Sequence, residues 1–202
     1  MPQILTIIIK GGIVMIPLLA CSLISLALSI ERILFGTRLK SKAVINEILA
    51  LVEKGEYEQA LKLGKNSPQP IARVLAAGIA HRNPAPAKAM EAAAQGEIPV
   101  LKSRLGILDT IVTLAPLLGL LGTVVGMIGS FDVMADGGIG QPHAVTGGVA
   151  EALIATATGL LIAILTLVSY NYFTARAERE MDQMEHFSSS LELQLHVQAD
   201  KH

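Results

Sequence analysis

A single carboxylate stands at the head of the longest uncharged stretch of the chain. Glu151 is followed by residues 152–175, which include no Asp, Glu, Lys or Arg. An acidic residue inside a membrane costs about 2.5 to 3.5 kcal/mol at a helix centre and usually serves ion or proton movement. A second reading makes Glu151 a first-turn carboxylate in the outer interface, at the positive end of a helix that begins after Gly147-Gly148. The residue pattern leaves both readings open.

The stretch after Glu151 separates into two faces when it is wound as an α-helix at about 100° per residue. The first face is small or polar: Glu151, Ala155, Thr158, Gly159, Thr166 and Ser169, with Ala152, Thr156 and Ala163 at its edge. The second face is apolar and suits lipid: Leu153, Ala157, Leu160, Leu161, Ile164, Leu167 and Val168. Small residues alone would allow close helix packing, so the threonines and the glutamate suggest a wet or functional interior.

An earlier apolar stretch carries a stripe of small residues. Its members recur at steps of 4, 3, 4 and 3: Ala115, Gly119, Gly122, Gly126 and Gly129. Such a stripe lets two membrane helices approach closely, and Thr123 flanks it. Pro116 removes a backbone donor, which a membrane helix tolerates where neighbours or water satisfy the freed carbonyl.

The composition places these stretches in a membrane. The chain has 202 residues, of which 51% are hydrophobic and 3% aromatic, more apolar than a soluble domain requires. Three windows lack charged residues: 11–30, 110–131 and 152–175. Roughly 20 helical residues cross a hydrocarbon layer of about 30 Å. We therefore predict an all-α membrane protein with three transmembrane helices.

The distribution of basic residues predicts the orientation. Residues 31–104 hold 12 of the 16 Lys and Arg, whereas residues 132–147 hold none. Positive segments stay in the cytoplasm, so the N-terminus and the second connection face outward. The net charge of −1 gives no indication of a nucleic-acid partner. The alternative of a cleaved signal peptide at Ala27-Leu28-Ser29 is disfavoured because the positive charges follow the apolar run.

The cytoplasmic parts are predicted to be helical. Residues 41–65 show a 3.6-residue apolar stripe broken at Gly55, which indicates a helical hairpin. Further helices are expected near 71–81 and 85–105. The tail keeps helical spacing beyond the third span, through Phe173, Ala177, Met181, Met184, Leu191 and Leu195, and is expected to pack on the other cytoplasmic helices.

Two ordered stretches occupy the second and third predicted spans: LAPLLGLLGTVVGMIGSF at 114–131, and AEALIATATGLLIAI at 150–164 followed by Tyr170-Asn171. Together they resemble the paired signature of the ExbB/TolQ/MotA proton-channel family, and Glu31-Arg32 after the first span fits as well. Because MotA-type members have four spans, the resemblance is closest to the three-span ExbB and TolQ type. One departure is Leu165, which stands where many relatives have a proline that kinks the helix.

The resemblance implies a homopentamer whose second and third spans line a central pore around the single helices of an ExbD-like or TolR-like dimer. It makes Glu151, Thr123 and Thr156 the expected proton-pathway residues, and leaves Gly119, Gly122, Gly126, Thr158, Gly159 and Pro116 for pore or helix packing. Protons are the expected coupling ion, and no cofactor or metal is implied. A TonB-like or TolA-like protein is a further expected partner.

In the bacterial inner membrane, the resemblance and the charge distribution together divide the chain into seven segments: periplasmic N-terminus 1–10, transmembrane helix 11–31, cytoplasmic helical region 32–104, transmembrane helix 105–131, periplasmic loop 132–147, transmembrane helix 148–173 and cytoplasmic C-terminal helix 174–202. The expected function is that of an ExbB-like motor subunit that energises TonB-dependent outer-membrane transport. A TolQ-like subunit of the Tol-Pal system and a passive membrane scaffold are the alternatives.

Other classes of protein are disfavoured by the same sequence. The five histidines are scattered outside the predicted spans, and no nucleophile triad, metal spacing or phosphate loop indicates an enzyme. A solute transporter would be expected to show an inverted repeat or a pair of broken helices.

Overall fold

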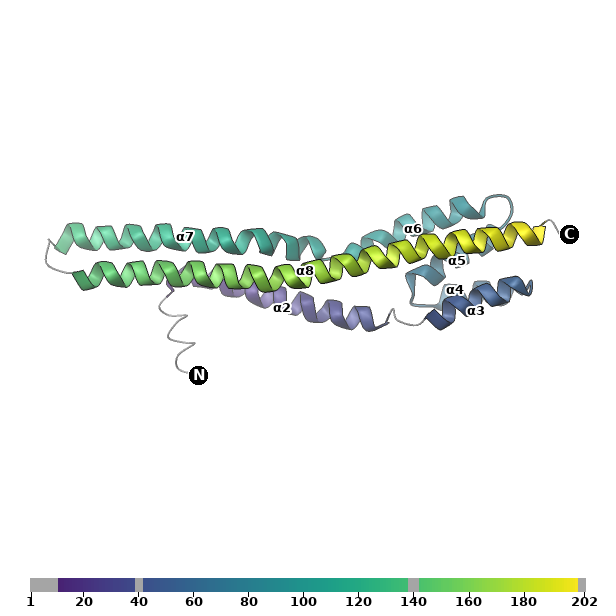
Figure 1. Ribbon diagram of the computed structural model, residues 1–202, viewed down its shortest axis with the longest axis horizontal. Helices are drawn as coiled ribbons and strands as arrows, with labels where there is room; N and C mark the ends of the chain where they lie inside the picture. Colours follow the sequence, from purple (N-terminus) through teal and green to yellow (C-terminus); the bar gives the residue numbers. More distant parts are fainter. Residues whose placement is uncertain (1–10, 39–41, 138–141, 200–202) are drawn as a thin grey trace. The chain divides into compact units, whose positions relative to one another are not determined.

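The computed structural model describes residues 11–38, 42–137 and 142–199, and all regular secondary structure in these ranges is α-helical (Figure 1). The helices are α2 (Met15–Arg38), α3 (Lys42–Glu53), α4 (Tyr57–Asn66), α5 (Pro70–Ala80), α6 (Pro86–Lys102), α7 (Leu105–Gly137) and α8 (Pro142–Ala199). Three helical stretches are long and apolar enough to cross a membrane, by length and composition. The prediction of an all-helical chain with three candidate spans is therefore confirmed.

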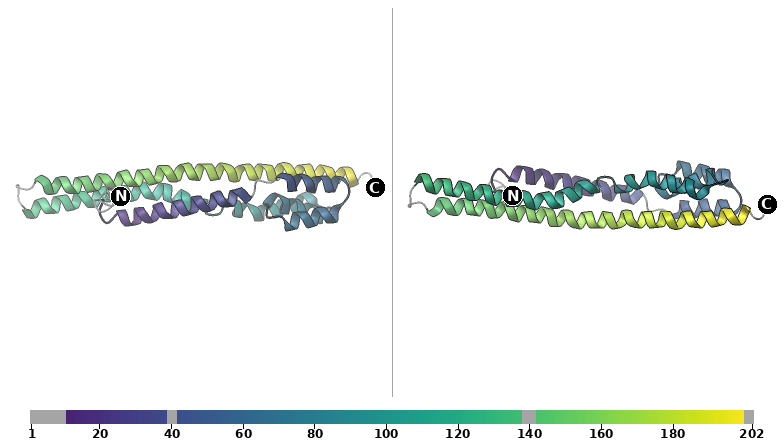
Figure 2. Two further views of the ribbon diagram at one scale, coloured as in Figure 1. Left: turned by 90° about the horizontal axis from the view of Figure 1, so that it is seen from below. Right: turned by 90° about the horizontal axis from the view of Figure 1, so that it is seen from above.

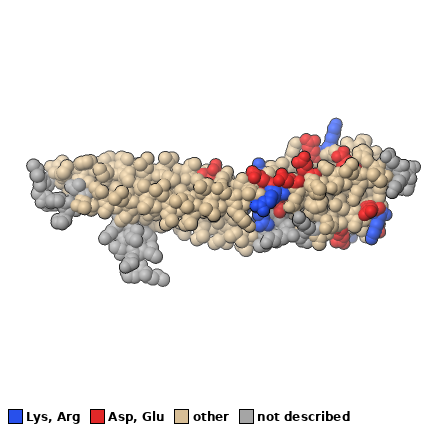
Figure 3. All heavy atoms as spheres, viewed as in Figure 1, with Lys and Arg blue, Asp and Glu red and all other residues tan. Residues whose placement is uncertain are grey.

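The chain divides into two compact units. The span unit comprises residues 11–30 and 104–172, and the hairpin unit comprises residues 31–103 and 173–199. Helices α2 and α8 contribute residues to both units. Lys, Arg, Asp and Glu gather over the hairpin unit, whereas the visible face of the span unit is almost free of them (Figure 3). This separation is the one expected if only the span unit lies in lipid.

The span unit is built around two long antiparallel helices, α7 and α8 (Figures 1 and 2). Their backbones approach closely along the glycine stripe: the Cα of Gly119 lies 3.2 Å from an ideal Cβ built on Gly159. Helix α2 completes the buried core, which consists of Val14, Met15, Leu18, Cys21, Ile111, Ala115, Ile162 and Ala163. Leucine, isoleucine and valine side chains on the outer faces of all three helices are exposed, as lipid-facing positions should be.

The predicted loop at 132–147 is wrong for most of its length. Helix α7 continues to Gly137 and α8 begins at Pro142, so only residues 138–141 are left between them, and these lie outside the described residues. Proline is well suited to the start of a helix, because its missing N–H has no intrahelical partner there. The loop was predicted from the glycine-rich composition, whereas Pro142 starts a helix within this segment.

The hairpin unit begins with the predicted helical hairpin, α3 and α4. Gly55 has φ of +80°, and the N–H groups of Gly55 and Glu56 donate to the carbonyls of Val52 and Leu51 at 3.0 and 2.9 Å. This arrangement ends α3 in a Schellman motif, which requires a residue with positive φ and so favours glycine. The break in the apolar stripe at Gly55 is therefore a helix end.

Helix α5 forms the centre of the hairpin unit, with eight of its eleven residues buried. Arg73 on α5 donates from Nε and Nη2 to the two carboxylate oxygens of Glu97 on α6, at 2.7 and 2.5 Å. The hydrogen bond to Glu97 raises the pKa of the Arg73 guanidinium, and this two-point ion pair fixes α6 against α5.

The C-terminal part of α8 packs on these helices, as predicted for the tail. Phe173, Ala177, Met184, Leu191 and Leu195 are all buried. Near the end of the helix, Gln198 donates to the carbonyl of Glu53 at 2.7 Å and accepts a hydrogen bond from the hydroxyl of Tyr57. The helix predicted at 85–105 corresponds to α6, which ends at Lys102, and α7 starts at Leu105 after Arg104 adopts φ of +65°.

Candidate functional site

The inner face of α8 agrees closely with the predicted small and polar face. Its buried residues are Ala152, Ala155, Gly159, Ile162, Ala163 and Thr166. The predicted lipid face is exposed at all seven of its positions. Glu151, Thr156 and Thr158 are half-buried, so the polar side chains border the packed face without lying at its centre.

Thr156 lies where α8 meets α7. Its hydroxyl donates to the carbonyl oxygen of Gly119 at 2.8 Å, across 37 residues of sequence. This contact is possible because residue 119 has no side chain: a Cβ there would lie 3.0 Å from the Cα of Thr156 and 3.1 Å from the carbonyl of Ala155. Gly119 therefore serves both close packing and the exposure of a polar backbone group to Thr156.

Glu151 lies on the other border of the buried face, next to the start of α2. An ideal Cβ on Gly12 would stand only 1.8 Å from Oε1 of Glu151, so the carboxylate occupies the space that any other residue would fill. Gly12 has φ of +72°, and its carbonyl accepts the N–H of Met15 in the first turn of α2. The carboxylate thus lies near the positive end of the α2 dipole.

The first-turn reading of Glu151 is wrong, because α8 begins nine residues earlier, at Pro142. The dipole effect falls off within the first turn of a helix, so the start of α8 is too far away to act on the carboxylate. The residue that sequence reasoning missed here is Gly12. A glycine just before an apolar run marks a helix start, but nothing in the sequence pairs it with a carboxylate 139 positions away.

Thr123 lies at the same level along the α7–α8 pair as Glu151 and Thr156, the other two predicted pathway residues. Gly119 of α7 lies opposite Thr156, and Gly126 lies against Ala152 and Gly148. Since the helices are antiparallel, Thr123 falls level with the stretch between Glu151 and Thr156, which spans about 7.5 Å of helix. The hydroxyl of half-buried Thr123 donates to the carbonyl of Leu120 at 2.6 Å. Thr123, Glu151 and Thr156 form one polar band across α7 and α8. Within the described ranges, no hydrogen bond joins these three residues to one another.

Four of the predicted packing residues, Gly119, Gly122, Gly126 and Gly159, lie where α7 and α8 approach closely. A Cβ on Gly122 would meet that of Ala155 at 2.5 Å, one on Gly126 would meet the Gly148 carbonyl at 2.9 Å, and one on Gly159 would meet the Ala115 carbonyl at 2.5 Å. A Cβ on Gly129, at the end of the stripe, would meet nothing within 4 Å among the described residues apart from the backbone of its own helix. Of the two other predicted packing residues, Thr158 donates to the Ile154 carbonyl of its own helix, and Pro116 is half-buried inside α7, which continues past it.

A second polar contact, between α2 and α8, was not predicted. The hydroxyls of Ser25 and Thr166 are 2.7 Å apart and buried, and Thr166 also reaches the Ile162 carbonyl at 2.8 Å. The sequence placed Thr166 on the inner face, but nothing in it indicated which residue of the first span would face it. The pair ties α2 to α8 about ten residues below Thr156.

Comparison with known proteins bears directly on this arrangement. Residues 66–186 match the model of a family described as the MotA/TolQ/ExbB proton channel family. The chain belongs to this family. The matched range covers all of α7 and the part of α8 that carries Glu151 and Thr156, so both predicted signature stretches lie inside it.

Individual relatives point to two branches of the family. The chain is 37% identical over 190 residues to the putative biopolymer transport protein ExbB-like 3 of Synechocystis, covering 91% of this chain and 90% of that protein. It is 38% identical over 110 residues to the Tol-Pal system protein TolQ of Pseudomonas aeruginosa, covering 54% of this chain and 48% of that one. It is 37% identical over 81 residues to the biopolymer transport protein ExbB of Aquifex aeolicus, covering 40% and 55%.

Proposed function

We propose that this chain is an ExbB-like subunit of a proton-driven motor in the bacterial inner membrane. The observation that carries the proposal is the polar band of the span unit. Glu151 is half-buried inside a candidate span and forms no hydrogen bond or ion pair with the described residues. Since an ionisable group at such a position is costly, it is usually retained for ion or proton work.

In the proposed assembly, five copies surround the single helices of an ExbD-like dimer. Thr123, Thr156 and Glu151 would face a titrating carboxylate on the partner helix. A proton that crosses the membrane carries about 2.3 kcal/mol per 100 mV, enough to change the protonation and the preferred position of such a carboxylate. The chain contributes polar groups at fixed depth, and the partner would move relative to them, passing work to a TonB-like protein.

The proposed orientation follows the basic residues: the N-terminus and residues 138–141 outward, the hairpin unit in the cytoplasm. An ExbB role is favoured over a TolQ role because the similarity to the ExbB-like protein of Synechocystis extends over nearly the whole chain, whereas that to TolQ covers about half. A TolQ-like role with TolR-like and TolA-like partners is the second candidate. A passive scaffold would use the glycine stripe but would have no need of the polar band.

Proton flux tests the proposal. The chain and its single-span partner are reconstituted in liposomes that enclose a pH-sensitive dye, and a potential is applied. We expect flux from the complex and its loss in Glu151→Gln and in Thr156→Val. Flux should be normal in Thr113→Val, whose hydroxyl donates to the Thr110 carbonyl of its own helix. Normal flux from a fully assembled Glu151→Gln, Thr156→Val double variant would refute the assigned pathway, and no flux from the wild-type complex would favour the scaffold.

A further inference from the structure

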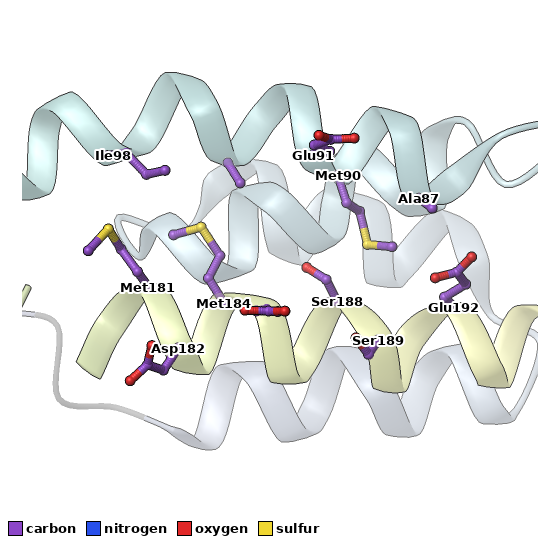
Figure 4. A pocket seen from close by; sticks show the side chains of 12 residues that line it. Ala87, Met90, Glu91, Ile98, Met181, Asp182, Met184, Ser188, Ser189 and Glu192 are labelled. Atoms are coloured by element: carbon purple, nitrogen blue, oxygen red, sulfur yellow. The ribbon is translucent and has the colours of Figure 1, made fainter. Parts of the chain in front are cut away.

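The hairpin unit contains a groove that the proposed proton pathway does not use. It runs between α6 and the C-terminal part of α8, with a volume of about 400 Å³. Figure 4 shows the two helices on opposite sides of the groove, with Ala87 near Glu192 at one end and Ile98 near Met181 at the other. These residues are eleven positions apart on each helix, so the groove is about 16 Å long.

The floor of the groove is apolar and adaptable. Met90 and Met184 are buried at its base, and Ile98 and Met181 are half-buried at one end. Met90 is held from below, because its side chain fills the space over Gly78 of α5. Methionine is flexible and polarisable and is common on surfaces that accept varied apolar side chains. The floor is therefore suited to receive apolar anchors from another helix.

The rim of the groove is acidic on both sides. Glu91 of α6 and Asp182, Glu185 and Glu192 of α8 are among the lining residues. The lining residues include no Lys or Arg. Glu192 lies 3.8 Å from His196, whereas Glu91, Asp182 and Glu185 form no ion pair with the described residues. The carboxylates of α8 extend over ten residues, about 15 Å, so they suit an elongated cationic partner.

We propose that this groove docks a cationic amphipathic helix of another protein. Roughly eleven helical residues match its length. Apolar side chains at i, i+4 and i+7 would rest on the methionine floor, and Lys or Arg on the flanks would face the carboxylates. The charge of the rim selects this occupant, because it repels anionic lipid headgroups and acidic peptides alike. The site is independent of proton conduction.

Binding of a designed probe tests the proposal. The full-length protein is placed in nanodiscs of phosphatidylcholine, which has no net charge to attract the probe. The probe is a fluorescent twelve-residue helix with Leu at i, i+4 and i+7 and Lys on both flanks, and a scrambled peptide of the same composition is the control. We expect fluorescence anisotropy to report saturable binding of the helix that weakens as salt is raised, and no saturable binding of the scrambled peptide.

Variants locate the binding. Asp182→Lys combined with Glu185→Lys should raise the Kd about tenfold or more, and Ser188→Trp should abolish binding by filling the groove. Glu178→Lys is the matched control, since Glu178 is exposed on the same helix outside the groove; it should change the Kd less than about twofold. Circular dichroism and gel filtration verify that each variant is folded.

Three results would overturn the proposal. The first is equal binding of the helical and scrambled peptides, and the second is an unchanged Kd in both groove variants. The third is a photo-crosslink from a photoreactive residue at position 188 to a second copy of the chain in the purified assembly, which would identify the groove as an interface between subunits. Because proton flux is not the readout, failure here leaves the proposed motor function untouched.

Discussion

Gly159→Ala should force α7 and α8 apart within the span unit. An ideal Cβ at this position lies 2.5 Å from the carbonyl oxygen of Ala115, against 3.4 Å for an ordinary contact. The obstructing atom is backbone and cannot rotate away, so the helices have to separate locally by about 0.9 Å. The hydrogen bond from Thr156 to the Gly119 carbonyl would lengthen from 2.8 Å to about 3.7 Å, beyond bonding range.

The energetic consequence has three parts. Overpacking costs about 1 to 3 kcal/mol, and loss of the interhelical hydrogen bond costs about 0.6 kcal/mol. The higher helix propensity of alanine offsets about 1 kcal/mol. The net expected loss in the free energy of unfolding is about 0.6 to 2.6 kcal/mol.

The assay is SDS titration of the purified protein in mixed micelles, followed by far-UV circular dichroism. Gly129→Ala is the control: Gly129 lies on the same glycine stripe, but a Cβ there would have no neighbour within 4 Å among the described residues apart from the backbone of its own helix, so alanine there should stabilise the helix by up to about 1 kcal/mol. Equal unfolding free energies for Gly159→Ala and Gly129→Ala, within about 0.5 kcal/mol, would refute the close approach at Gly159.

Two further predictions concern the contacts of α2. Gly12→Ala should push the Glu151 carboxylate about 1.6 Å from its position to restore an ordinary contact, and so lower proton flux severalfold. Gly55→Ala is the control, because Gly55 has a similar φ but open space around it, and this variant should leave proton flux unchanged. Equal losses of flux in the two variants would assign the effect to backbone strain. Thr166→Val keeps the shape of the side chain but leaves the Ser25 hydroxyl without its 2.7 Å partner. The unfolding free energy should therefore fall by about 0.6 to 1.7 kcal/mol. An unchanged unfolding free energy would show that the Ser25–Thr166 pair contributes nothing to stability.

Helix periodicity predicted the inner face of α8 because the membrane leaves few ways to bury small residues. A transmembrane helix has to present either lipid-soluble side chains or a packed face, and Ala155, Gly159 and Thr166 cannot belong to the first group. The same reasoning found the stripe on α7. Here the sequence pattern and the physical requirement coincide, so both faces could be predicted, whereas their contact with each other is a finding of the structure.

Helix periodicity could not predict which residues of different helices contact each other. A wheel assigns residues to faces but does not set the register between helices, so the Ser25–Thr166 pair and the placement of Glu151 over Gly12 emerged only from the fold. The start of α8 also differs from the prediction, because a glycine-rich composition predicts a loop where the structure has a helix from Pro142 onward. A helix start depends on a single residue such as Pro142, and the average composition of the segment does not reveal it.

Chemical access to α8 in the assembled complex tests whether the side of α8 that carries Thr156 borders a water-filled pathway instead of lipid. Single cysteines are introduced at Thr156 and, one turn further on, at exposed Leu160, in a Cys21→Ala background, and each is treated with a charged, water-soluble thiol reagent or with a lipid-confined maleimide. We expect the water-soluble reagent to modify position 156 and the lipid-confined reagent to modify position 160. Modification of position 156 by the lipid-confined reagent alone would contradict this expectation.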